Sequence, residues 1–383
     1  MRKVILFGIV VMLLIFNACE KKTNYTVVET EDGKVIINKK ISDDPELKVN
    51  LKYTGQINSN RSAEDSLGFF WMSTVHKLPG DNILVQGYNP KGRLTLYNSN
   101  FKFIRSFSPT GQGPGENEGY SGTIIINNKI YAFFSNSDKV NIFDLSGEYI
   151  ESFNLGFIVT EIHKLSEHRI IATKWEHLTL DKDSDELTIE NILMDNDFNQ
   201  IKVVDRFYKI IEHGVAASSQ MYPFICGNET NLYISWISDS EYKIDVYDSN
   251  TGDKKYQIKK DFRSYFYKDI EMDRMSELNG INMKEKFGNI KKRAINEIFV
   301  DKYNRLWVLA TNERNSENLS GMYVDIFKNG IYQNSIQFKD LVYYDGTGSK
   351  LYYRIRFIGD KLIYFNADEF DDEKGRNIKF YDY

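Results

Sequence analysis

The stretch HKLPGDNILV, residues 76–85, contains the smallest unit from which this fold can be built. A strand-like segment leads into a tight polar turn, Pro79-Gly80-Asp81-Asn82, and a second apolar strand begins at Ile83. Turn residues between two short strand-like runs predict an antiparallel hairpin.

The hairpin recurs five more times, at Ile124–Ala132, His163–Ala172, Ile225–Ile234, Phe299–Val308 and Ile355–Tyr364. After each copy comes a third strand that ends in a bulky residue, usually followed by Asp or Asn. In the first five copies a short turn then leads to a fourth strand. Repeated units of four antiparallel strands predict the blades of a β-propeller. We therefore expect an all-β fold, a six-bladed β-propeller of four-stranded antiparallel blades.

The sixth copy lacks a fourth strand, because the chain ends at Tyr383 directly after the third. An unassigned strand-like segment, Leu47–Ile57, precedes the first blade. We expect this N-terminal segment to supply the missing outer strand, because a closed ring has no open sheet edge. An open array of sheets is the alternative.

The N-terminus is typical of a secretion signal. Arg2 and Lys3 precede an apolar run, Val4–Phe16, and the chain becomes polar after Cys19. The run is too short for a membrane-spanning helix, which needs about 20 residues. The ending Asn17-Ala18-Cys19 resembles a bacterial lipobox, whose Cys is lipidated and becomes the mature N-terminus. Acyl chains on Cys19 would then hold the protein on a membrane.

These features predict three segments. We expect residues 1–18 to be a lipoprotein signal peptide, 19–46 a lipidated polar tether with one hairpin at Thr26–Lys39, and 47–383 the propeller. The second cysteine, Cys226, would then have no disulfide partner. Its apolar surroundings favour a small buried filler over a nucleophile.

Charge excludes one class of partner. The 49 basic and 54 acidic residues give a formal net charge of −5, with no concentrated basic stripe. Nucleic-acid binding normally depends on such a stripe, so we expect no nucleic-acid partner.

The blade pattern, the lipobox-like ending and the loop Gly111-Gln112-Gly113-Pro114-Gly115-Glu116 together resemble the six-bladed propeller lipoproteins common in Bacteroidota, which are distant relatives of NHL-repeat proteins. Asn117 stands where that family often has an aromatic residue. The resemblance covers essentially the whole mature chain and implies a lipid-anchored protein of the cell envelope. Glu20 after Cys19, in place of Asp, favours the outer membrane. The resemblance implies little about activity.

The two faces of the expected ring differ in loop length. Links between strands one and two, and three and four, are tight. The other links are long: Ser108–Gly122, Glu176–Glu190, Arg206–Tyr222, Asn312–Gly321 and Lys339–Tyr353. Loops of this length are uncommon unless they have a role, so we expect the long-loop face to bind a partner.

The largest excursion, near 261–293, has apolar residues at helical spacing in two halves, the first acidic and the second basic. We expect a helical insertion whose halves pair with each other and pack on the ring. A lid or a partner-docking arm is the functional alternative.

The motifs of serine hydrolases, zinc proteases and P-loop enzymes are missing from the sequence, which predicts no catalytic residue, metal or cofactor. His76 and His163 share one repeat position, seven residues before the second strand of blades one and three, where both would line the central channel. The other blades have Thr123, Ile225, Phe299 and Ile355 there. Because a metal site needs a third ligand, packing or hydrogen bonding is the preferred interpretation of both histidines.

His76, His163 and Glu116 are therefore candidate ligand-binding residues. We expect a binding module in the cell envelope, attached to a membrane through its N-terminal lipid and recognising a protein, a peptide or a glycan. A lyase or hydrolase acting on a glycan or peptide in the funnel is the alternative. A structural component of an envelope complex is a third possibility.

Overall fold

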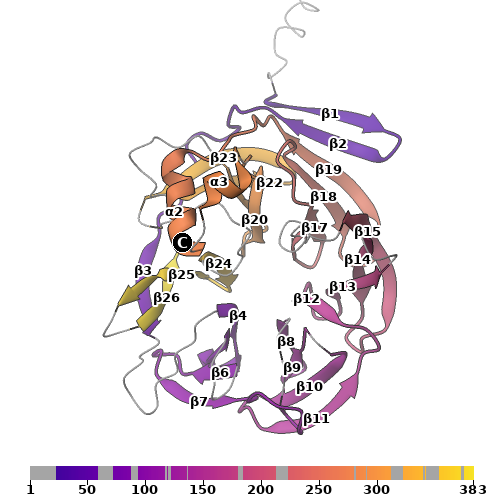
Figure 1. Ribbon diagram of the computed structural model, residues 1–383, viewed down its shortest axis with the longest axis vertical. Helices are drawn as coiled ribbons and strands as arrows, with labels where there is room; N and C mark the ends of the chain where they lie inside the picture. Colours follow the sequence, from indigo (N-terminus) through magenta and orange to yellow (C-terminus); the bar gives the residue numbers. More distant parts are fainter. Residues whose placement is uncertain are drawn as a thin grey trace, which may run out of the picture.

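The computed structural model describes residues 23–58, 72–87, 94–116, 119, 122–135, 137–179, 184–212, 223–279, 282–289, 291–311, 322–339, 341, 353–371 and 375–383. Their strands form six sheets that stand as blades around a central axis (Figure 1). Within each blade four strands pair antiparallel, in chain order from the axis outward except in blade 6, where the N-terminal β3 is outermost; this confirms the predicted six-bladed β-propeller.

The strands of each blade are as follows. Blade 1 comprises β4 (Met72–Lys77), β5 (Ile83–Gly87), β6 (Leu94–Tyr97) and β7 (Phe103–Phe107), with the 3-10 turn η1 (Pro79–Asp81). Blade 2 comprises β8 (Gly122–Ile126), β9 (Lys129–Phe133), β10 (Lys139–Asp144) and β11 (Tyr149–Asn154). Blade 3 comprises β12 (Val159–Lys164), β13 (Ile170–Thr179), β14 (Ser184–Met194) and β15 (Gln200–Glu212).

The second half of the ring follows the same plan. Blade 4 comprises β16 (Phe224–Gly227), β17 (Asn231–Ser235), β18 (Lys243–Asp248) and β19 (Lys254–Lys260). Blade 5 comprises β20 (Ile295–Val300), β21 (Leu306–Ala310), β22 (Met322–Lys328) and β23 (Ile331–Phe338). Blade 6 comprises β24 (Tyr353–Ile358), β25 (Lys361–Asp371), β26 (Gly375–Asp382) and β3 (Lys52–Asn58).

The ring is closed by the N-terminal strand, as predicted. β3 pairs antiparallel with β26, and Ile57 lies opposite Ile378. Ile57 is buried in an apolar cluster that also holds Val75 and Val85 of blade 1. The chain ends therefore meet in one sheet, and the closing strand packs across the boundary between blades 6 and 1.

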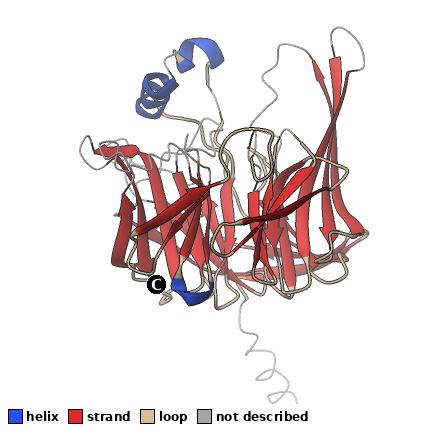
Figure 2. Cartoon of the chain, turned by 90° about the horizontal axis from the view of Figure 1, so that it is seen from below, coloured by secondary structure: helices blue, strands red, loops and turns tan. Residues whose placement is uncertain are grey.

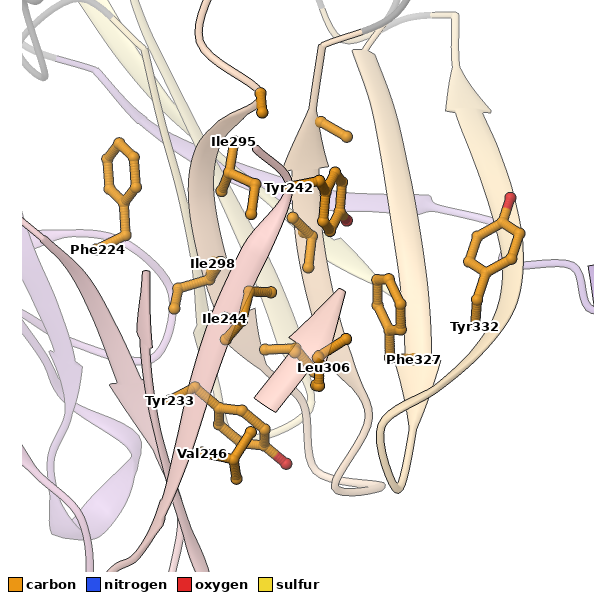
Figure 3. Close-up of a cluster of buried hydrophobic side chains, with 14 residues drawn as sticks. Phe224, Tyr233, Tyr242, Ile244, Val246, Ile295, Ile298, Leu306, Phe327 and Tyr332 are labelled. Atoms are coloured by element: carbon orange, nitrogen blue, oxygen red, sulfur yellow. The ribbon is translucent and has the colours of Figure 1, made fainter. Parts of the chain in front are cut away.

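Apolar clusters fill the spaces between neighbouring blades. The cluster between blades 4 and 5 includes Tyr233 and Val246 on one side and Ile298 and Leu306 on the other (Figure 3). Burial of such surface stabilises a fold by about 25 cal/mol per Å². Each blade is thus held by both of its neighbours.

The recurrent Asp or Asn after the third strand has a local structural cause. Side-chain oxygens of Asn98, Asp144, Asp195 and Asp248 accept backbone N–H groups two to four residues further along the chain. This Asx-type bonding shapes the turn to the fourth strand. The repeated residue is therefore part of the turn, not of a binding site.

The segment expected as a tether differs from the prediction. The predicted hairpin forms from β1 (Tyr25–Thr30) and β2 (Gly33–Asn38), but β2 also pairs parallel with β19 and so widens blade 4 to six strands. The buried Asn38 side chain donates to Gly330 O (2.9 Å) and accepts from Tyr332 N (2.8 Å). The described part of this segment is thus fixed against blades 4 and 5.

Two of the predicted long loops are wholly or partly strand. β13 and β14 continue the ladder through most of 176–190, and β15 extends to Glu212. These strands rise on the same side of the ring as the helices, whereas η1 lies on the opposite side (Figure 2). Ser108–Gly122 contains no strand over its described positions 108–116 and 119. Residues 312–321 and most of 339–353 lie outside the described residues.

The insertion near 261–293 contains two helices, α2 (Asp269–Asn279) and α3 (Met283–Phe287). Its acidic and basic halves pair as predicted: Lys284 Nζ lies 2.7 Å from Asp269 Oδ1, and Lys292 Nζ lies 2.5 Å from Glu271 Oε1. Residues 261–268 precede the helix, so the predicted helical spacing from Phe262 does not fall on one helix. Neither helix is long and apolar enough to span a bilayer, nor is any other helix that the structure describes.

Candidate functional site

The first strands of the blades line the axis, and their pairing changes the predicted repeat alignment. The residues that pair equivalently with the second strands are His76, Ile124, His163, Cys226, Phe299 and Arg356. His76, His163 and Phe299 agree with the prediction. Thr123, Ile225 and Ile355 are one residue off, because the hairpin turns of blades 2, 4 and 6 are one residue shorter than those of blades 1, 3 and 5.

The corrected alignment brings Arg356 to the level of the two histidines. All three side chains line a cavity of about 1030 Å³. Blades 1, 2, 3 and 6 form its wall, which includes the tight turns at Pro79–Asp81, Asn127–Asn128 and Gly359. This described cavity therefore lies toward the tight-turn face, whereas the sequence pointed to the long-loop face.

His76 belongs to a hydrogen-bond network between blades 1 and 2. Its Nε2 lies 2.9 Å from Thr123 Oγ1, and Thr123 in turn donates to Gln86 Oε1 (3.1 Å). Thr74 Oγ1 also donates to Gln86 Oε1 (2.8 Å). The interpretation of His76 as a hydrogen-bonding residue thus agrees with its surroundings.

Burial lowers the pKa of His76 from 6.5 to about 4, despite the opposing hydrogen bond to Thr123. The charge of His163 lowers it further, which indicates that the two rings share one electrostatic environment. His76 is therefore neutral at neutral pH and offers this cavity a hydrogen-bonding ring, not a cation.

This neutral state predicts a pH dependence of stability. The unfolded chain binds a proton near pH 6.5 but the folded chain only near pH 4, so the free energy of unfolding should fall through this window as the pH falls. The loss attributable to His76 is up to about 3 kcal/mol, at 1.36 kcal/mol per pKa unit. Urea unfolding of the wild type and of His76→Gln, each at about pH 7 and about pH 4.5, measures it. The wild type should lose more stability than the variant; equal losses would contradict the assignment.

His163 occupies the equivalent place in blade 3, where its nearest charged neighbour is Glu161. Its Nε2 lies 3.8 Å from Glu161 Oε2 and is buried without a hydrogen-bond partner among the described residues. An imidazole nitrogen without a partner is costly to bury. His163 is thus the histidine with unused hydrogen-bonding capacity beside the cavity.

Arg356 adds a cationic group to the cavity wall. Its Nη1 lies 3.4 Å from Glu297 Oε1, and its guanidinium carbon lies 5.4 Å from the centre of the Phe299 ring. The guanidinium has five donors, so one carboxylate does not exhaust it. Sequence reasoning missed Arg356 because it counted back from the second strand without allowing for turn length.

Cys226 lies near Arg356 and Glu297 and is packed against the apolar cluster between blades 4 and 5. Burial, and secondarily the Glu297 carboxylate, hold the pKa of its thiol well above the usual range. A thiol that stays protonated is a poor nucleophile. This agrees with the predicted role as a filler.

Glu116 lies apart from the histidines, on the link between blades 1 and 2. Its Oε2 accepts Gly113 N (2.9 Å), and its carbonyl oxygen accepts from Asn141 Nδ2 on β10 (2.9 Å). A Cβ on Gly111 or Gly113 would lie 2.1 or 2.9 Å from that same Oε2. The glycines therefore make room for a carboxylate that folds back and closes its own loop. Glu116 shapes the link and does not line the cavity.

Two further features of the predicted site concern metal ligands and Cys19. No three His, Cys, Asp or Glu side chains gather as metal ligands within the described ranges. Cys19 lies outside those ranges, so the structure does not describe the proposed lipidation site.

Similarity to known proteins was found among solved structures. A protein described as exported from Bacteroides fragilis NCTC 9343 is 15% identical, with a TM-score of 0.53 over 91% of this chain and 99% of that one. A member of the DUF4221 family from Bacteroides vulgatus ATCC 8482 is 13% identical, with a TM-score of 0.50 over 87% and 97%. The likeness shows the fold. Neither a protein-family model nor a curated protein sequence matches the chain.

Proposed function

We propose that the chain is a lipid-anchored binding module of the cell envelope, with its ligand site in the axial cavity. The cavity carries this proposal: at about 1030 Å³ it is at the upper end of the size range of small-molecule sites, roughly 300–1,000 Å³. Apolar side chains such as Ile124 and Ile162 share its wall with His76, His163 and Arg356. Charged side chains such as Lys77 and Glu167 also line it, so the cavity offers apolar and polar contacts together.

The envelope location is supported by the signal-like N-terminus with Cys19. It is also supported by the fold shared with a Bacteroides protein described as exported. In this proposal residues 1–18 are removed and Cys19 carries the lipid that attaches the protein to the outer membrane. The ligand is a peptide, a glycan or a segment of another envelope protein.

Thermal denaturation of the full-length lipidated protein in detergent, with panels of oligosaccharides and of short peptides, tests the cavity assignment. A ligand should raise the Tm of the wild type and have a much smaller effect on Arg356→Gln and His163→Gln. Tyr303→Ser is the matched control, because Tyr303 is exposed at the turn of blade 5 and is not among the residues lining the cavity. Equal shifts in all variants, or no shift with either panel, would contradict the proposal.

A further inference from the structure

The N-terminal hairpin brings the expected lipid close to one point of the ring. Asn24 is fixed at the base of the hairpin: its carbonyl accepts Lys39 N (2.9 Å), and its side chain donates to Ser42 O (2.9 Å). Five Cα-to-Cα steps lead from Cys19 to Asn24, and a fully extended chain covers at most about 3.6 Å per step. Cys19 therefore lies within roughly 18 Å of this point, whatever path the intervening residues take.

The same point is where the helical insertion leaves blade 4. Asp261 N donates to Asn38 O (3.0 Å), and Asn38 pairs with Tyr25 at the start of β1. β19 ends here, and the chain continues through residues 261–268 into α2, which stands with α3 on one side of the ring (Figure 2). The base of the hairpin and the start of the insertion thus lie at one rim of the molecule.

The insertion exposes apolar and basic side chains together. Phe266, which precedes α2, is 52% exposed, and Ile270, in the first turn of α2, is 43% exposed. Arg263 and Lys291 are exposed in the same insertion, and Lys291 pairs with Phe266 in an isolated bridge. We call Arg263, Phe266, Ile270 and Lys291 the insertion patch. In a chain of net charge −5, residues 261–293 contain eight basic and six acidic residues.

The insertion patch is held in place by contacts beneath it. Lys292 and Glu271 form a buried ion pair, with side chains 3% and 5% exposed. Lys292 N also donates to Tyr265 O (2.7 Å), and Ala294 N donates to Ser238 O of blade 4 (2.8 Å). A buried pair of this kind depends on good geometry, which favours one fixed orientation of the patch.

We infer that the insertion patch rests on the surface of the lipid bilayer in which Cys19 is anchored. This inference depends on the proposed lipidation of Cys19. Exposed aromatic and aliphatic side chains flanked by Lys and Arg are the composition that enters the interface of anionic membranes. The ring then stands with the rim of blades 4 and 5 toward the membrane, and the axial cavity at the tight-turn face stays open to the aqueous side.

Spin labels on the full-length lipidated protein test this contact. Phe266→Cys and Ile270→Cys are labelled singly, with Tyr303→Cys on the opposite face as the control. Cys226 is half-buried and the raised pKa of its thiol makes it react slowly, and wild-type protein treated with the same label gives the background. Each variant is reconstituted into vesicles of phosphatidylethanolamine and phosphatidylglycerol, and collisions with oxygen and with a water-soluble nickel complex are measured.

Labels at 266 and 270 should become several-fold less accessible to the nickel complex and more accessible to oxygen on reconstitution, while the label at 303 stays unchanged. Flotation of the vesicles distinguishes failure of the lipid anchor on Cys19 from failure of the contact between the insertion patch and the bilayer. Protein that floats while all three labels remain equally accessible to nickel would overturn the docking and leave the anchor intact. Wild-type protein that does not float would overturn the anchor and the docking with it.

Discussion

Ile57→Asp should lower the free energy of unfolding by more than about 4 kcal/mol, because it places a carboxylate inside the apolar junction that closes the ring. Ile57 is 1% exposed and lies among Val75, Ile378 and Phe380, from the first and last blades. An ionised carboxylate has no partner in such a cluster. We therefore expect loss of the cooperative unfolding transition in urea near neutral pH, or a midpoint far below that of the wild type.

Two further variants keep this prediction open to contradiction if Ile57→Asp fails to fold. Ile57→Val removes one methylene group and should cost about 0.5–1.5 kcal/mol. Val28→Asp introduces the same charge on the exposed strand β1, where Val28 is 39% exposed, and should cost much less than Ile57→Asp. An Ile57→Asp protein that unfolds like the wild type would show that β3 does not close the ring in solution.

Asp325→Ala should destabilise the protein by about 3–5 kcal/mol, because it leaves a buried cation without its counter-ion. Asp325 Oδ2 accepts from Lys260 Nζ (2.8 Å) and from Tyr242 OH (3.0 Å), and the Asp325 side chain is 3% exposed. Lys260 also lies 3.7 Å from the centre of the Tyr332 ring. This group joins blades 4 and 5 beside the docked hairpin.

The double variant Lys260→Met/Asp325→Leu separates the ion pair from simple packing. Replacement of both charges by apolar groups of similar volume is often nearly neutral, so the double variant should recover at least half of the stability lost in Asp325→Ala. Urea unfolding of the wild type, Lys260→Met, Asp325→Leu and the double variant gives the coupling energy. A double variant less stable than Asp325→Ala would contradict this account of the contact.

The ring and its closure could be predicted from the sequence because their signals are local and repeated. Each hairpin has its own turn residues, and a single strand-like segment before blade 1 was unassigned, which the structure pairs with β26. The parallel pairing of β2 with β19 has no such signal. Its partners, such as Ile36 and Ile258, are far apart in sequence and carry no motif. The hairpin was therefore expected on a tether.

The tall strands of blade 3 were missed for a different reason. Residues 176–190 are polar, and a polar stretch between two strands is typical of a loop. Beyond the body of the ring, however, residues Trp175–Thr179 of β13 still pair with β14. There the antiparallel hairpin does not have to be buried on both faces, so its side chains can be polar. Hydrophobic alternation is a weak guide where a hairpin extends beyond its core.

At the candidate site the two histidines could be predicted from their repeat position, but Arg356, the third residue at that level, could not. Arg356 is one residue from the position predicted for blade 6, because that hairpin turn is shorter. Glu116 was found as a charged group in a glycine-rich loop, but its contact with Gly113 depends on the folded loop. Pairing register and side-chain direction, which decide both cases, are properties of the assembled sheet.

Mass spectrometry of the N-terminal peptide tests the central claim, a propeller anchored through Cys19, most directly. The protein is purified from the membranes of a bacterial host that processes lipoproteins, alongside Cys19→Ser as the control. The account predicts a mature chain that begins at Cys19 and carries a diacylglyceryl thioether, with no acylated peptide from the variant. A chain that keeps residues 1–18, or one that begins after them with an unmodified Cys19, would contradict it.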